Sequence, residues 1–144
     1  MRRCLILANQ TLAGPRLLET VRQRVASGAH EFYIVVPATP IADQERATVG
    51  SGPPADHAHA LAAQRLTRAL DEIRALGAPA EGEVGDRDPL EATRLALRRF
   101  GADEVVVSTL RSGLSRWLRA DLPSRIERSL HLPVEHVVGD SAPD

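Results

Sequence analysis

Residues 88–108 read DPLEATRLALRRFGADEVVVS and carry the clearest structural signal in the chain. Asp88 is a residue type that caps helices, Pro89 suits the first helical position, and Glu91 stands where a capping box places an acidic residue. Apolar positions then repeat at helical spacing up to a glycine. Residues 104–108 are nearly all β-branched, as in a strand that is buried on both faces. A helix that leads into a buried strand is the repeating unit of an α/β fold.

The same alternation extends in both directions from this stretch. Short apolar runs, typical of buried strands, alternate with longer helical patterns. The expected strands are 4–8, 32–36, 80–84, 104–108 and 134–138, and the expected helices begin at Gly14–Pro15, near Asp56, at Asp88 and at Pro123. This order predicts an α/β fold with a single doubly wound, five-stranded parallel sheet and helices on both faces. The strand at 80–84 contains two glutamates and is therefore expected at an edge of the sheet.

Turn-forming residues set the boundaries of these elements. Gly28 is expected to end the first helix as a left-handed cap, and Pro37 is expected to stop the second strand. Residues 45–56 combine glycine, proline and serine without periodicity, which predicts a mobile loop. We therefore expect one domain over residues 1–139, followed by a polar tail at 140–144.

The composition excludes several classes of function. The chain has 144 residues with 18 basic and 19 acidic side chains, and a net charge of −1 argues against a nucleic-acid partner. Every basic residue is an arginine, which excludes a P-loop and lysine chemistry. The single cysteine, Cys4, excludes an intrachain disulfide. Apolar runs of at most five residues are too short for a signal peptide or a membrane span, so we expect a cytoplasmic protein without a membrane contact.

The expected sheet also locates a candidate ligand site. In a doubly wound sheet, ligands bind beyond the carboxyl ends of the strands. The segments at these ends are Asn9–Thr11, Val36–Pro37, Gly85–Arg87 and Ser108–Ser124. Any ligand of this chain is therefore expected to contact several of these four segments.

Three segments in the second half of the chain resemble the universal stress protein family. They are Gly85–Asp86 leading into DPLEA at 88–92, GADEVVVS at 101–108, and Leu132–Val134 before the last strand. The resemblance covers nearly the whole chain. It implies a Rossmann-like fold of the adenine nucleotide alpha hydrolase type with strand order 3-2-1-4-5. It also implies a homodimer and makes ATP or AMP a possible ligand.

Members of that family that bind ATP carry the motif G-x2-G-x9-G-[ST] after the fourth strand. Gly113 fits the second glycine, and Ser124 fits the hydroxyl position. Leu110 and Pro123 stand at the other two glycine positions, where leucine lacks glycine's backbone freedom and proline has no N–H. The family's aspartate after the first strand is Asn9 here, which can still form hydrogen bonds but carries no charge.

Three arginines in the same segment leave two interpretations open. Arg111, Arg116 and Arg119 either replace the lost phosphate donors or solvate a surface loop. The candidate ligand-binding residues are Asn9, Thr11, Val36, Gly85, Arg87, Ser108, Arg111, Gly113, Ser115 and Ser124.

These residues support one leading hypothesis and two alternatives. The leading hypothesis is a non-catalytic module that acts through ligand sensing and protein contacts. The first alternative is an authentic ATP or AMP binder whose phosphate donors are Arg111, Gly113, Ser115 and Ser124. The second alternative is a nucleotide hydrolase on the same fold.

Other patterns that could carry chemistry have simpler explanations. Asp86 and Asp88 match the D-x-D of phosphatases, but they follow an edge-like strand, and Asp88 suits a helix cap. His57 and His59 lack a third metal ligand at diagnostic spacing and fit a solvated helix start. Trp117 either packs its loop onto the sheet or forms a wall of the ligand pocket. The sequence has no G-x-S-x-G motif, which argues against a serine hydrolase.

The fifth strand, Val134–Val138, is expected at an open edge of the sheet. It contains no proline or lysine and one acidic residue, Glu135, so this edge is a template for another strand. Antiparallel pairing of two copies would place two His136 side chains opposite each other, in a dimer that acid would loosen. The alternative is a monomer whose edge is covered by residues 139–144.

Overall fold

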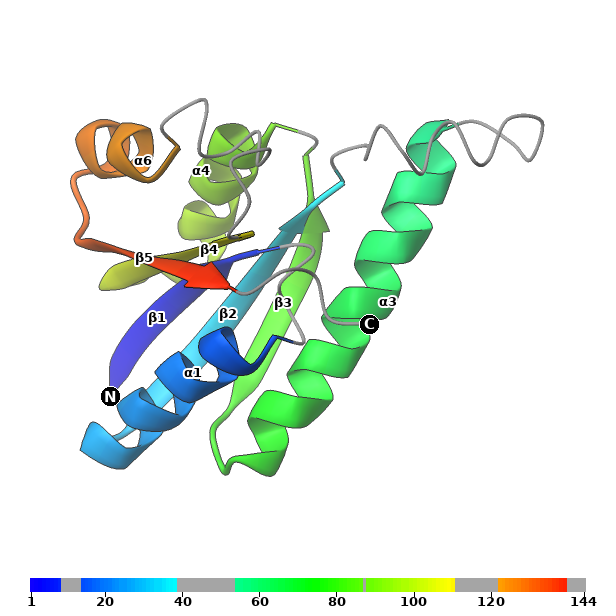
Figure 1. Cartoon of the computed structure of the whole chain (residues 1–144). Coiled ribbons are helices and arrows are strands. Elements are labelled where there is room, and N and C mark those ends of the chain that lie inside the picture. The colour runs from blue at the N-terminus through cyan, green and yellow to red at the C-terminus, as the bar shows by residue number, and fades with distance from the viewer. Residues whose placement is uncertain (9–13, 39–53, 87, 111–121, 140–144) are drawn as a thin grey trace.

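A computed structural model describes residues 1–8, 14–38, 54–86, 88–110 and 122–139. The elements are β1 (Arg2–Leu7), α1 (Pro15–Ser27), β2 (His30–Pro37), α3 (Pro54–Ala75), β3 (Ala80–Gly85), α4 (Pro89–Phe100), β4 (Glu104–Leu110), α6 (Leu122–Leu130) and β5 (Val134–Gly139). The strands form one parallel sheet in the order β3-β2-β1-β4-β5 (Figure 1). The predicted fold class and strand order are confirmed.

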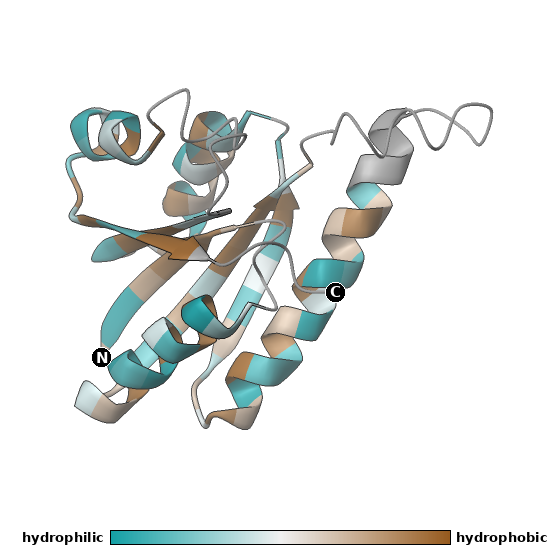
Figure 2. Ribbon diagram, in the orientation of Figure 1, coloured by the Kyte–Doolittle hydropathy of each residue, from teal (hydrophilic) through white to brown (hydrophobic). Residues whose placement is uncertain are grey.

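Two helical layers cover the two faces of the sheet. Helices α1 and α3 pack on one face, and α4 and α6 pack on the other. Strand β1 contributes to both cores because successive side chains point to opposite faces, so Ile6 contacts the first layer and Leu5 the second. The inner strands are mostly hydrophobic toward their carboxyl ends, whereas the edge strand β3 and the outer sides of the helices are largely hydrophilic (Figure 2).

The predicted helix between the third and fourth strands forms as its sequence indicates. The Asp88 side chain accepts a hydrogen bond from the Leu90 backbone N–H at 3.0 Å, which satisfies one free donor of the first turn. The helix ends at Gly101, whose φ of 60° is left-handed and whose N–H donates to Leu97 O at 3.0 Å. Both ends of α4 are therefore fixed by local residues.

Gly28 differs from the prediction, whereas β2 ends at Pro37 as expected. Gly28 has φ 156° and ψ −179°, so it is not in the αL conformation of the expected cap, although this positive φ is one that residues with a side chain rarely adopt. Pro37 belongs to β2 and pairs with Gly85 of β3. Its missing N–H is tolerated there because β1 pairs with β2 only as far as Val35.

Two further boundaries were misplaced by the sequence pattern. Helix α3 begins at Pro54, so residues 54–56 of the expected mobile loop are helical. The rest of that loop, and the tail at 140–144, lie outside the described residues. Strand β4 continues past Ser108 to Leu110, where it pairs with Gly139. The parallel partner strand extends β4 beyond its β-branched run.

Candidate ligand-binding site

The carboxyl ends of three strands meet at one end of the sheet. The Ala8 N–H donates to Val35 O at 3.3 Å, and the Ala38 N–H donates to Gly85 O at 3.1 Å. These bonds hold the ends of β1, β2 and β3 side by side. Two predicted site residues, Val36 and Gly85, are thereby brought to this edge.

Two of the expected ligand contacts have buried side chains. Val36 is 0% exposed and Ser108 is 1% exposed, and Val36 packs in the core formed with α1 and α3. A ligand at this edge would meet Val36 through its backbone, because its side chain is part of the core. The Ser108 side chain is likewise closed off from solvent.

Gly85 has a structural requirement that is independent of any ligand. A Cβ atom at this position would lie 2.8 Å from Ala92 Cβ and 3.2 Å from Val35 Cγ1. Both neighbours are buried, so neither can move away without disturbing the core between β2 and α4. The absence of a side chain at Gly85 allows α4 to approach the sheet closely.

The structure places three positions of the predicted phosphate motif. Leu110, at the first glycine position, is still part of β4 and lies in the ladder with Gly139. Pro123 and Ser124 lie in the first turn of α6, where Ser124 is exposed. A free N–H or hydroxyl at a helix N-terminus attracts anions, and Ser124 supplies the hydroxyl while Pro123 removes one N–H.

Six of the ten predicted site residues lie outside the described residues. They are Asn9, Thr11, Arg87, Arg111, Gly113 and Ser115. The same holds for Arg116, Arg119 and Trp117, so the role of these arginines and the packing of the tryptophan stay predictions.

A polar pair that was not predicted from the sequence lies at this end of the sheet. Thr109 Oγ1 in β4 lies 2.7 Å from His136 Nε2 in β5, and Thr109 is 2% exposed. Burial lowers the pKa of His136 below 6.5, so the ring is neutral near pH 7. Side-chain alternation along two neighbouring strands was the available signal, because it places both residues on the face covered by α4 and α6.

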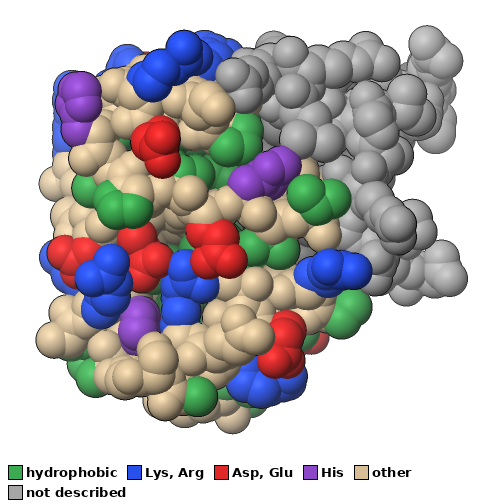
Figure 3. All heavy atoms as spheres, turned by 60° about the vertical axis from the view of Figure 1, so that its left-hand side comes forward, with side chains coloured by type: hydrophobic (Ala, Val, Ile, Leu, Met, Phe, Trp, Pro, Cys, Tyr) green, Lys and Arg blue, Asp and Glu red, His purple; other side chains and the backbone are tan. Residues whose placement is uncertain are grey.

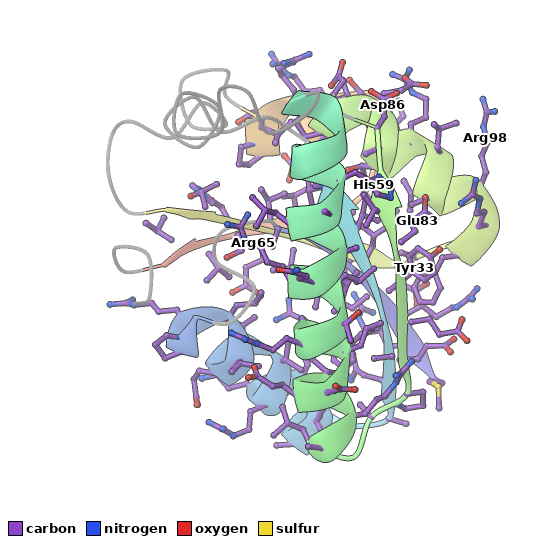
Figure 4. All side chains as sticks on the ribbon, turned by 90° about the vertical axis from the view of Figure 1, so that its right-hand side faces the viewer. Tyr33, His59, Arg65, Glu83, Asp86 and Arg98 are labelled. Carbon is purple, nitrogen blue, oxygen red and sulfur yellow. The ribbon has the colours of Figure 1, made fainter. Side chains whose placement is uncertain are left out.

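The Asp86–Asp88 pattern is occupied by local hydrogen bonds. Asp86 Oδ1 accepts from the Asp88 backbone N–H at 2.9 Å, and Asp88 caps α4. Figure 4 shows Asp86 at the end of β3, beside the start of α4. The predicted helix cap is confirmed, and the two carboxylates stabilise the turn between β3 and α4.

A second polar group lies further down the same sheet edge. The Tyr33 hydroxyl donates to Glu83 Oε1 at 2.6 Å (Figure 4), and Arg99 Nη1 donates to the same oxygen at 2.9 Å. Burial, together with the Glu83 carboxylate, raises the pKa of Tyr33 to about 12. The phenol is therefore neutral and held as a donor, which suits a structural link between β2, β3 and α4.

Metal binding finds no support in the described part of the chain. Among the residues with described placement, no group of three histidine, cysteine, aspartate or glutamate side chains could hold a metal ion. His59 is exposed on α3.

Among the helices of the described residues, none is both long and apolar enough to cross a membrane.

Solved structures of universal stress proteins share this architecture. The protein from Archaeoglobus fulgidus matches 95% of this chain and 98% of its own, with a TM-score of 0.64 and 16% sequence identity. A universal stress protein in complex with cAMP matches 94% of this chain and 96% of its own, with a TM-score of 0.62 and 20% identity. A family member from Burkholderia pseudomallei matches 93% of both chains, with a TM-score of 0.62 and 16% identity. These likenesses show a shared fold.

A second structure of the Archaeoglobus fulgidus protein, in complex with dAMP, has a TM-score of 0.63 at 14% identity and matches 95% of this chain and 98% of its own. No protein-family model and no curated protein sequence matches the chain.

Proposed function

We propose that the chain is a universal-stress-protein-like module that acts without catalysis, through ligand sensing and protein contacts. The carrying observation is the state of the phosphate motif, in which Leu110 belongs to a strand and Pro123 to the first turn of a helix. The cytoplasmic location expected from the sequence is part of this proposal.

The two substitutions remove features that a phosphate loop needs. A glycine at position 110 would be free to turn toward a ligand, whereas Leu110 continues the ladder with Gly139. Proline at position 123 has no N–H to donate to a phosphate oxygen. A hydrogen bond to a charged group contributes about 1.5–3 kcal/mol, so each lost donor weakens phosphate binding by about tenfold or more.

An adenine nucleotide is the ligand class to test first. Two of the similar structures are complexes with dAMP and cAMP, both of which carry a single phosphate. The alternative of an authentic ATP or AMP binder is favoured by the exposed Ser124 at the start of α6. In that alternative, Arg111, Gly113, Ser115 and Ser124 hold the phosphates.

Calorimetry with AMP and ATP separates these two functions. We expect weak or undetectable ATP binding by the wild type, and a gain of about tenfold or more in the double variant L110G/P123G. Adding S124A to this variant serves as the control, because it removes the hydroxyl while keeping both glycines. Tight ATP binding by the wild type that R111A weakens would instead establish the authentic binder.

The nucleotide hydrolase is tested by turnover. Incubation of the protein with ATP and magnesium should release no phosphate above the level seen with denatured protein. Sustained release that depends on magnesium would overturn the non-catalytic proposal.

We also propose that two copies associate through β5, as the sequence analysis expects. The opposite edge strand, β3, is protected by exposed Glu81 and by Arg74, which donates to Ala80 O at 2.7 Å and 3.0 Å. The β5 edge carries one exposed acidic residue, Glu135, and one exposed valine, Val138, which is 37% exposed. An edge with this little protection favours strand pairing.

Sedimentation of the wild type and V138P tests the dimer. The Val105 N–H donates to Pro133 O at 2.9 Å, so the odd-numbered residues of β5 bond to β4 and the N–H of Val138 faces the open edge. Proline at position 138 removes this outward donor and should weaken pairing. A monomeric wild type, or a V138P variant that dimerises equally tightly, would overturn the proposal.

A further inference from the structure

Both polar side chains in β5 are hydrogen-bonded to their own subunit. Arg24 Nη2 of α1 donates to Glu135 Oε1 at 2.6 Å, and the ring of His136 is bonded to Thr109 at 2.7 Å. Because side chains alternate along a strand, these two contacts lie on opposite faces of the sheet. The groups of β5 that remain available to contact a second copy are therefore its backbone N–H and C=O groups and its valine side chains.

The contact on the α1 face belongs to a larger ionic network. Arg24 also donates to Glu104 Oε1 at 2.8 Å through Nη2 and at 3.3 Å through Nε, and Arg2 donates to Glu104 Oε2 at 2.9 Å. The side chains of Arg24 and Glu104 are 15% and 12% exposed, whereas that of Glu135 is 51% exposed. Figure 3 shows this face, where acidic and basic side chains meet in one row. The buried Glu104 carboxylate thus fixes the position of the Arg24 guanidinium, and the more exposed Glu135 binds to the same guanidinium.

The charge of Glu135 matters for self-pairing of β5. In an antiparallel pair centred on His136, Glu135 lies opposite the partner's Val137, and the two Glu135 side chains lie diagonally on the same face. Diagonal neighbours in a sheet are about 7–8 Å apart, within reach of long side chains. Two free carboxylates at this separation would repel each other across the junction.

We infer that Arg24 makes the β5 edge competent for pairing with a second copy, because it neutralises Glu135 and draws its carboxylate back onto α1. This inference rests on the proposed homodimer. Arg24 is a positioning residue in this scheme: it acts on the edge through Glu135 and is not itself part of the strand pair. Glu104 supports it by fixing the guanidinium on the other side.

The test compares the dimer dissociation constants of R24Q, R22Q and the wild type by sedimentation equilibrium. R22Q is the matched control, since Arg22 lies on the same helix but pairs with Glu19 of α1 at 2.7 Å. We expect R24Q to weaken the dimer by roughly threefold to tenfold at low ionic strength and by less at high salt. R22Q should leave the dissociation constant unchanged.

Rescue separates the electrostatic role from a loss of folding. The double variant R24Q/E135Q should regain the wild-type dissociation constant, because the unneutralised carboxylate is gone. If R24Q/E135Q dimerises as weakly as R24Q, the inference is overturned, because the weaker dimer would then result from the lost contact between Arg24 and Glu104. If R24Q does not fold, R24K is tested in its place. R24K should weaken the dimer less than R24Q would, and adding E135Q should again restore the wild-type dissociation constant.

The outcomes also distinguish this inference from the homodimer itself. A wild type that sediments as a monomer at all concentrations removes the homodimer, and the inference with it. A dimeric wild type whose dissociation constant is unchanged in R24Q overturns the inference alone.

Discussion

Replacing Gly85 by alanine tests whether this residue is present for packing. The new Cβ would lie 2.8 Å from Ala92 Cβ and 3.2 Å from Val35 Cγ1. The first distance is shorter than real Cβ contacts, and Ala92 and Val35 are 1% and 0% exposed. The substitution therefore requires α4 to move away from the sheet by several tenths of an ångström or more.

The expected cost follows from overpacking in a closed core. Inserting one methyl group into a well-packed interior destabilises by about 1–3 kcal/mol. For a domain of this size, that loss lowers the melting temperature by roughly 3–9 °C. Urea unfolding of G85A should show a lower midpoint with an unchanged slope, because the native fold is kept.

A double-mutant cycle with A92G identifies the cause. Because A92G removes the atom that the new Cβ would meet, G85A should cost less in the A92G background than in the wild type. G82A is the matched control: its Cβ would meet Ile34 O and Leu66 Cδ1, not Ala92, so A92G should not rescue it. A stable G85A, or equal costs in both backgrounds, would refute the packing explanation.

Three further predictions concern single residues. Cys4 is 0% exposed and burial raises its pKa to about 12, so a thiol reagent at pH 8 should label it only after unfolding; rapid labelling of the folded protein would contradict this. The pKa of His136 is lowered by burial, so the unfolded chain binds its proton first, and the free energy of unfolding should fall as the pH drops below 6.5. H136Q should flatten that part of the urea-derived stability profile, and an unchanged profile would argue against it. D88A should cost about 1 kcal/mol through loss of the α4 cap, measured by urea unfolding against D86A, which keeps that cap.

Short local sequence patterns were sufficient to predict most elements of the fold. Helix α4 was predictable in full because its cap, its apolar spacing and its terminal glycine are all encoded within one short segment. The three valines at 105–107 indicated the fourth strand, because β-branched residues favour strands. The alternation of such segments then limited the topology, since parallel strands need helical crossovers of one hand.

Boundaries were less predictable where a neighbouring strand decides them. Leu110 extends β4 because Gly139 offers a parallel partner, and Pro37 remains in β2 because Gly85 lies beside it. Gly28 was expected in the αL conformation, yet its φ of 156° and ψ of −179° lie outside that region. A residue's own propensity does not report the strand that will lie next to it.

The candidate site divides in the same way. The sequence by itself determined which segments follow the carboxyl ends of the strands, and which positions of the predicted phosphate motif hold a residue other than glycine, because both follow from order along the chain. Only the tertiary structure decided that Gly85 leaves room for Ala92, that Thr109 binds His136, and that Arg24 reaches Glu135. These contacts join residues that are 7 to 111 positions apart, and their distances depend on how closely the helices approach the sheet. Side-chain periodicity specifies a face, whereas the partner on that face is selected by packing in three dimensions.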